Sequence, residues 1–206
     1  MKILERRLED LGELAGNMQQ GRDARPDWLQ ALDVDPTSVY YRFLYHCSAM
    51  LKPSVSFEIG TCEGKSAAHL AAGCPSGTVI TIDIRRSSKA ATDQLLVPNL
   101  ISIVGDSLQV PSVLKWMPQL DLLFIDGVHE LSQAYREYLM YRPYVKEGGL
   151  IFFDDIHINP GMDQLWELVR DPKQELPTLH YTGFGVAAKD PSVEPISLEE
   201  VVPQPA

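Results

Sequence analysis

Short apolar runs alternate with segments of helical period through the middle of the chain. The apolar runs are strand-sized and rich in β-branched residues: Ser54–Ile59, Thr78–Ile84, Leu100–Val104, Asp121–Asp126 and Gly149–Asp154. The helical segments that follow them are Lys65–Ala72, Ser87–Leu96, Leu108–Trp116, Glu130–Tyr144 and Gly161–Arg170. Strands that are apolar along their whole length are typical of parallel sheets with helices on both faces. With right-handed crossovers, these units predict a doubly wound α/β fold.

The N-terminal part of the chain has the pattern of helices. Apolar residues recur three and four positions apart, at Leu4, Leu8, Leu11, Ala15 and Met18. This seam predicts an amphipathic helix, which either packs on its own domain or forms a homodimer with a second copy. The segment Gly21–Pro26 interrupts the pattern, and a second helix is expected from Pro36–Ser38 to Met50.

The C-terminal part is expected to close the sheet and then to leave it. After Arg170, the segments Thr178–Thr182 and Phe184–Lys189 flank Gly183, which predicts an antiparallel hairpin. From residue 191 the chain is rich in proline and acidic residues, which is typical of an extended tail. We therefore expect a helical extension over residues 1–52, an α/β domain over 53–190 and a tail over 191–206.

Composition and charge narrow the class of protein. The chain has 206 residues, of which 45% are hydrophobic and 22% charged, as in one packed domain with an extension. Its net charge of −10 repels polyphosphate, so we expect no nucleic acid partner. No apolar run approaches the ~20 residues that span a bilayer, and we find no apolar signal region, so we expect a cytoplasmic protein without a membrane partner. Cys47, Cys62 and Cys74 form no Cys-x-x-Cys pair, which disfavours a structural zinc site and a disulfide framework.

A glycine-containing turn follows the first predicted strand. The pattern acid-x-Gly-x-x-x-Gly-x-Ser begins at Glu58, includes Gly60 and Gly64, and ends at Ser66. Glycine permits a sharp turn and a close backbone approach, and the helix that starts near Lys65 offers free N–H groups to an anionic group. The spacing fits neither the dinucleotide pattern Gly-x-Gly-x-x-Gly nor the P-loop, which is one residue longer. The turn is therefore a candidate site for an anionic ligand of a different kind.

Acidic residues end the next two predicted strands. Asp83 could accept hydrogen bonds from both ribose hydroxyls of an adenosine ligand, and Asp106 could accept one from an adenine amino group. Each could instead cap the helix that follows it. Because the carboxyl ends of parallel strands share one edge of the sheet, the glycine turn, Asp83 and Gly105-Asp106-Ser107 together favour an adenosine-containing ligand.

Three more carboxylates end the fourth and fifth predicted strands. Asp126 ends the fourth strand, and the pair Asp154-Asp155 ends the fifth. We expect these strands to be neighbours, which would bring the carboxylates into one crevice. Close carboxylates repel unless a cation or a proton balances them, and oxygen-only ligands favour Mg²⁺ or Ca²⁺. Alternatively, one aspartate caps the next helix and the others are solvated.

Over residues 54–189 the chain resembles the class I S-adenosylmethionine-dependent methyltransferases. The turn from Glu58 to Ser66 resembles their first motif, as catechol O-methyltransferase-like members have it. Ile125-Asp126-Gly127, with Gly148-Gly149 and Asp154-Asp155, resembles the metal-dependent O-methyltransferases of catechols and antibiotic sugars. The resemblance implies a Rossmann-like, mostly parallel, seven-stranded sheet with an N-terminal helical extension. It also implies Mg²⁺-dependent methyl transfer from S-adenosylmethionine to a small hydroxylated acceptor.

The resemblance further implies roles for single residues. Gly60 would lie against the cofactor, Ser66 would bind its methionine carboxylate, and Asp83 would bind its ribose; Asp106 or Ser107 would meet the adenine. The expected cofactor-binding set is Glu58, Gly60, Thr61, Cys62, Gly64, Ser66, Asp83, Asp106, Ser107 and Asp126. The expected Mg²⁺ ligands are Asp126, Asp154 and Asp155.

The expected catalytic residues are His129 and Asp126. Catechol-type enzymes have a lysine base three residues after the first metal aspartate, and this chain has His129 there. An imidazole can take a hydroxyl proton near neutral pH, and His157 is a second candidate for this role. Candidate residues to line the acceptor pocket are Tyr40, Tyr41 and Trp166. Two alternatives stay open: a metal-independent N- or carboxyl-methyltransferase, and a scaffold subunit without activity.

Overall fold

The computed structural model describes residues 2–18, 20, 23–32, 39–85, 97–109 and 118–201. The helix predicted over 87–96, most of the one over 108–116 and the helix start at 36–38 lie outside the described residues. The described helices are α1 (Lys2–Asn17), α2 (Asp27–Gln30), α3 (Tyr40–Leu51), α4 (Lys65–Gly73), α7 (Leu131–Tyr141), α8 (Pro160–Leu168) and α9 (Leu198–Val201), with a 3₁₀ turn at Arg142–Tyr144. None of these described helices is long and apolar enough to cross a membrane.

The strands form one seven-stranded sheet of order β3-β2-β1-β4-β5-β7-β6. They are β1 (Val55–Ile59), β2 (Thr78–Asp83), β3 (Leu100–Val104), β4 (Leu120–Ile125), β5 (Val145–Asp154), β6 (Lys173–Glu175) and β7 (Phe184–Ala188). The first five are parallel, and β7 pairs antiparallel with both β5 and β6. This confirms the predicted doubly wound, mostly parallel fold. The strand order reverses between β1 and β4, which is where ligands bind in such sheets.

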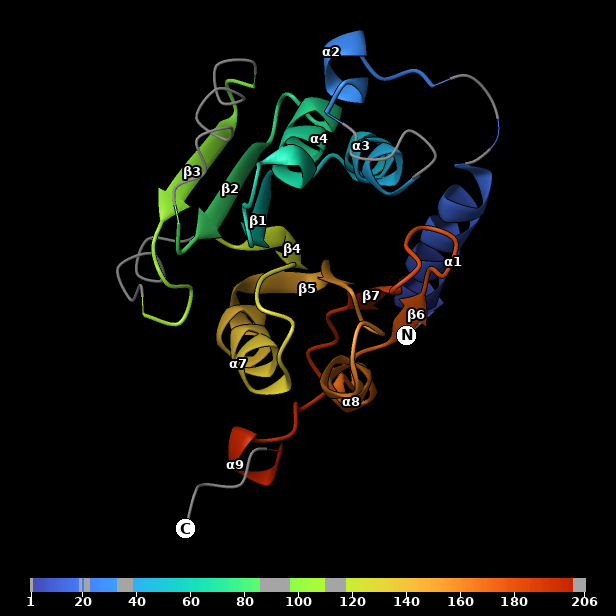
Figure 1. Ribbon diagram of the computed structural model, residues 1–206. Coiled ribbons are helices and arrows are strands. Elements are labelled where there is room, and N and C mark those ends of the chain that lie inside the picture. The colour runs from blue at the N-terminus through green and yellow to red at the C-terminus, as the bar shows by residue number, and fades with distance from the viewer. Residues whose placement is uncertain are drawn as a thin grey trace.

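Helices cover both faces of the sheet, with α1, α3 and α4 on one face and α7 and α8 on the other (Figure 1). Strand β4 shows why its last four residues are all apolar. Leu122 and Phe124 pack into the first hydrophobic cluster, and Leu123 and Ile125 pack into the second. Because successive side chains of a strand point to opposite faces, the part of a strand that lies between two helical layers needs apolar residues on both faces.

The N-terminal helix packs on its own chain. Leu8, Leu11, Ala15 and Met18 are buried, and α1 contacts β7, α3 and β6. This confirms the first of the two interpretations of the apolar seam. The homodimer stays a prediction.

Two predictions about the C-terminal part need correction. The predicted strand Thr178–Thr182 is wrong, because the partner of β7 is β6, and residues 176–183 form a loop with turns. Pro177 has no N–H to give to a sheet, and this loop instead crosses the end of β5. The predicted extended tail is tied down where it is described: Tyr135 donates a hydrogen bond to the Ile196 carbonyl oxygen at 2.9 Å, and α9 follows.

Candidate functional site

The turn after β1 brings the backbone of this strand against the end of β4. Gly60 has a φ of +103°, and a Cβ at this position would lie 1.8 Å from the Asp126 carbonyl oxygen. Gly64, at the N-cap of α4, has a φ of +77°. Both positions require glycine, because side chains rarely tolerate these angles and no space exists for one at Gly60. The tight turn leaves room for a ligand above the carboxyl end of β1.

A cavity of about 280 Å³ opens at the carboxyl ends of β1, β2, β3 and β4. Its lining includes six predicted cofactor residues: Gly60, Cys62, Asp83, Asp106, Ser107 and Asp126. Asp83 holds the turn in place, since its carboxylate accepts a hydrogen bond from the Cys62 N–H at 2.8 Å. Ile84 and Val128 also line the cavity although they are 68% and 44% exposed. Exposed apolar side chains beside carboxylates suit a ligand with a flat ring and a polyhydroxylated sugar.

Four predicted cofactor residues, Glu58, Thr61, Gly64 and Ser66, lie outside the lining of this cavity. The fully buried Glu58 carboxyl accepts a hydrogen bond from Thr81 at 2.5 Å, and its Oε1 has no hydrogen-bond partner among the described residues. The Thr81 and Thr61 hydroxyl oxygens are 2.7 Å apart. Burial, partly offset by these hydrogen bonds, raises the pKa of Glu58 to about 7. These side chains therefore support the turn from outside the cavity.

The stability of the fold is expected to fall as the pH rises through 7, because the buried Glu58 must then ionise. Its pKa is about 7 when folded against an ordinary 4.5, so its contribution is complete below 4.5 and is lost through 7. From pH 5 to pH 8 this loss amounts to about 2 kcal/mol. Urea unfolding of the wild type and of Glu58→Gln at both pH values measures it. The wild type should lose more stability than the variant, and equal losses would contradict the assignment.

At the end of the cavity near β3, Asp106 and Ser107 make hydrogen bonds within the chain. Asp106 accepts a hydrogen bond from the Leu108 N–H at 2.9 Å, and the Ser107 hydroxyl donates to Glu137 Oε1 at 2.5 Å. Glu137 comes from α7, lines the cavity and is fully buried, and this burial raises its pKa despite hydrogen bonds from Ser107 and Gln133. Glu137 was missed from sequence. One sequence feature could have indicated this residue: a carboxylate on the buried side of a predicted helix, three residues after Ala134 and four before Tyr141.

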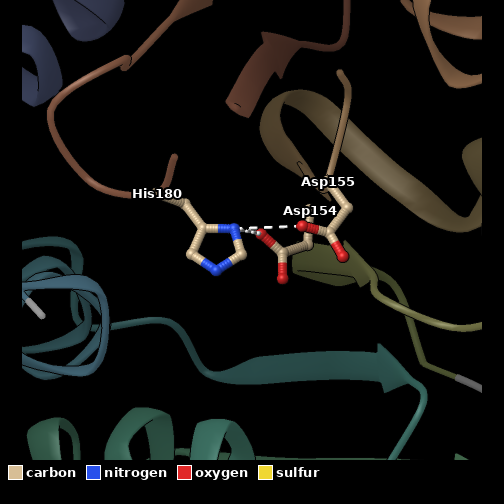
Figure 2. A group of neighbouring side chains, drawn as sticks. All are labelled: Asp154, Asp155 and His180. Atoms are coloured by element: carbon tan, nitrogen blue, oxygen red, sulfur yellow. Dashed lines mark ion pairs between the residues drawn. The ribbon is translucent and has the colours of Figure 1, made fainter. Parts of the chain in front are cut away.

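The predicted carboxylates do converge at the ends of β4 and β5, and two histidines join them. His180 Nδ1 is 3.0 Å from Asp155 Oδ1 and 3.5 Å from Asp154 Oδ1 (Figure 2). His129 Nε2 is 3.4 Å from Asp155 Oδ2 and 3.6 Å from Asp126 Oδ1. Among the described residues, the group whose ligand atoms all lie within 4.8 Å of one another is Asp154, Asp155 and His180. Asp126 lies beside this group and also lines the cavity at the ends of β1 to β4.

Charge is unevenly distributed in this cluster. Burial, together with the charges of Glu58 and Asp155, raises the pKa of Asp126 well above its ordinary value. Burial and the charges of Asp126 and Asp155 do the same to the pKa of Asp154. Asp155 is the exception: burial opposes its ionisation, but hydrogen bonds from His180 and Thr182 hold its pKa below the ordinary value. The described residues near Asp126 and Asp154 therefore supply too little positive charge to keep both carboxyl groups ionised.

Two further observations indicate that the cluster could hold a cation. Asp154 is 6% exposed, and its Oδ1 has no hydrogen-bond partner among the described residues. Asp155 adopts a φ of +54°, an angle that a non-glycine residue keeps only when its surroundings impose it. Buried carboxylate oxygens without donors are the atoms that a divalent cation requires.

Two of the four residues predicted near the acceptor, His157 and Trp166, have their contacts outside the cluster. The His157 ring is bound to Asp163, at 2.6 Å, and to Glu175, at 2.9 Å, so its contacts do not favour the predicted role as a base. Trp166 packs in the core, edge-on to Phe153, and does not line a pocket at this site. Tyr41 stacks on His69. Tyr40 does reach the cluster: its hydroxyl lies 3.5 Å from Asp126 Oδ2, and its ring is 5.5 Å from the His180 ring.

Comparisons with known proteins agree with this geometry. A family model described as a methyltransferase domain matches residues 57–156, from β1 to just beyond β5. No curated protein matches the chain.

Solved structures with the same fold include three methyltransferases. An O-methyltransferase from Streptomyces achromogenes involved in tomaymycin synthesis, in complex with S-adenosylmethionine, is 17% identical over 88% of this chain and 97% of its own, with a TM-score of 0.64. A Podospora anserina methyltransferase bound to S-adenosylhomocysteine is 16% identical over 88% and 96%, with a TM-score of 0.63. A Bacillus cereus O-methyltransferase in complex with S-adenosylhomocysteine is 20% identical over 88% and 90%, with a TM-score of 0.59. The chain therefore carries a methyltransferase domain over residues 57–156, on the fold of the class I S-adenosylmethionine-dependent methyltransferases.

Proposed function

We propose that this protein transfers the methyl group of S-adenosylmethionine to a hydroxyl oxygen of a small molecule, with the help of a divalent cation. The observation that carries the proposal is the position of Asp126. Its side chain lines the cofactor cavity on one side and lies 3.6 Å from His129 on the other. Asp126 therefore lies between the cavity that would hold the methyl donor and the cluster that would bind and deprotonate the acceptor hydroxyl. The net charge of −10 favours a small acceptor over a nucleic acid.

The residues of the chain have separable tasks in this reaction. Asp83 would accept hydrogen bonds from the ribose, and Ile84 and Val128 would contact the adenine. His129 Nε2 would take the hydroxyl proton, and the carboxylates of Asp126 and Asp155 lie 3.6 and 3.4 Å from this atom.

Asp154 and Asp155, with Asp126 beside them, are the residues that would hold the cation, for which the sequence favours Mg²⁺. A divalent cation lowers the pKa of a bound hydroxyl and fixes its direction. The protein's contribution is mainly alignment, since orienting a nucleophile and a methyl group is worth on the order of 7–11 kcal/mol in the best intramolecular cases.

Calorimetry with S-adenosylhomocysteine and a methyl-transfer assay test this function. The assay follows isotopically labelled methyl from S-adenosylmethionine into a panel of catechols and hydroxylated sugars. We expect S-adenosylhomocysteine to bind, a hydroxyl to be methylated and EDTA to abolish turnover. Full turnover in EDTA would favour the metal-independent alternative, and no binding of S-adenosylhomocysteine would favour a scaffold subunit.

Asp83→Asn is expected to weaken S-adenosylhomocysteine binding about tenfold or more, because hydrogen bonds to a charged acceptor are worth about 1.5–3 kcal/mol. The asparagine oxygen can still accept the hydrogen bond from the Cys62 N–H, so the turn should persist. Calorimetry measures the change. Asp163→Asn is the matched control, since Asp163 is half-exposed and paired with His157 outside the site. Equal affinities of wild type and Asp83→Asn would remove Asp83 from the cofactor site.

A further inference from the structure

His180 reaches the carboxylate cluster from a loop that the sheet itself holds in place. The loop joins β6 to β7, and its end is tied to the chain that follows Asp155. The His157 N–H donates to the Thr182 carbonyl oxygen at 2.7 Å, and the Ile156 N–H donates to the Gly183 carbonyl oxygen at 3.3 Å. The Thr182 hydroxyl donates to Asp155. The imidazole is therefore positioned by backbone contacts and not by its own ion pairs alone.

The three side chains are spaced as ligands of one cation. His180 Nδ1 lies 3.0 Å from Asp155 Oδ1 and 3.5 Å from Asp154 Oδ1 (Figure 2). Atoms bound to one octahedral cation at about 2.1–2.4 Å lie roughly 3.0–3.4 Å from their neighbours. Asp154 Oδ1, which is buried and has no hydrogen-bond donor among the described residues, points into the same group. A buried carboxylate oxygen without a donor indicates a cation more directly than the closeness of acidic residues does.

We infer that His180 Nδ1, with Asp154 and Asp155, completes a divalent cation site that favours first-row transition ions such as Mn²⁺ over Mg²⁺. A cation there takes the place of the proton on Nδ1. The inference rests on the proposed function only for what the cation does in the reaction, and not for its binding.

Donor chemistry sets this preference. Mg²⁺ demands oxygen ligands and gives up its waters reluctantly, whereas imidazole nitrogen suits transition ions. The sequence-based set of Asp126, Asp154 and Asp155 has oxygen donors only and predicts Mg²⁺. Replacing one of these oxygens by the His180 nitrogen shifts the affinity toward Mn²⁺ and the ions after it in the series.

Electron paramagnetic resonance with Mn²⁺ tests the site without any turnover. Titrating the wild type gives the affinity for Mn²⁺, and competition with Mg²⁺ gives the preference, which we expect to be at least about tenfold for Mn²⁺. His180→Gln should lose at least about tenfold in Mn²⁺ affinity and most of the preference. His157→Gln is the matched control, because His157 also lies between two carboxylates but outside the cluster. It should bind Mn²⁺ as the wild type does.

Electron spin-echo modulation from a directly bound nitrogen in the Mn²⁺-loaded wild type gives a second readout, which does not depend on a variant that folds. Absence of Mn²⁺ binding, absence of the nitrogen signal, or unchanged affinity in His180→Gln would each overturn the inference. In that case His180 is a cationic partner of the aspartates and not a ligand. Calorimetry with S-adenosylhomocysteine on the same samples separates the two proposals: binding of this ligand without Mn²⁺ refutes only the cation site, and the reverse refutes only the methyltransferase activity.

Discussion

Replacing His129 by glutamine is expected to lower the turnover number by about 10²- to 10⁴-fold, the range that a positioned general base contributes. His129 Nε2 faces the carboxylates of Asp126 and Asp155 at 3.6 and 3.4 Å, so the atom that would accept the proton lies at the cluster. The Asn159 side chain donates to the His129 carbonyl oxygen at 2.9 Å, which fixes the backbone from which the imidazole projects. Glutamine keeps most of the volume and polarity but cannot accept the proton.

The split between binding and turnover distinguishes this role from a structural one. S-adenosylhomocysteine affinity and the unfolding midpoint of His129→Gln should stay near the wild-type values, because His129 is absent from the cavity lining. Initial rates against pH provide the second measurement, since loss of the base should remove the acidic limb of the profile. His157→Gln, outside the cluster, should behave as the wild type. A His129→Gln rate within about threefold of the wild type would assign the proton to another acceptor.

The sheet could be predicted from sequence because each of its strands, and each helix that follows one, has a recognisable hydrophobic pattern of its own. Five apolar runs of strand length, each followed by a helical segment, leave few topologies other than a doubly wound sheet. The closing hairpin could not be placed, because β6 is only three residues long and its residues Lys173, Gln174 and Glu175 are polar. Nothing in such a segment distinguishes a short edge strand from a loop, whereas the Thr-rich segment 178–182 has the composition of a strand.

In the candidate site, residues at the ends of strands could be predicted from sequence, whereas residues brought in by packing could not. Residues at the ends of strands, such as Asp83, Asp126 and Asp154, could be grouped in advance because parallel strands end at one edge. Glu137 and His180 enter from a helix and a loop whose positions depend on packing. No spacing rule relates His180 to Asp155, 25 residues earlier. Conversely, Glu58 belongs to the motif, but its buried carboxyl accepts a hydrogen bond from Thr81 and lies outside the lining of the cavity.

A buried ion pair outside the site is expected to have the largest effect on stability. Asp171 is 2% exposed and accepts two hydrogen bonds from the Arg142 guanidinium, both at 2.7 Å. Its carboxylate also accepts from the Tyr138 hydroxyl at 2.8 Å and from the Asp190 N–H at 2.9 Å. Arg142 in turn donates to the Val193 carbonyl oxygen at 3.0 Å. This pair therefore joins α7, the chain after α8 and the segment that follows β7.

Asp171→Ala should lower the free energy of unfolding by about 3–5 kcal/mol, because it leaves the Arg142 charge buried without a counter-charge. Urea unfolding followed by circular dichroism measures this loss. Lys146→Ala is the matched control: it breaks the Lys146–Asp121 pair, whose side chains are 39% and 28% exposed, and should cost no more than about 1 kcal/mol. The double variant Arg142→Met with Asp171→Leu should recover much of the loss, since well-packed apolar residues can replace a buried pair at little cost. If Asp171→Ala cost no more than the control, the C-terminal segment would be held by its apolar contacts and not by this network.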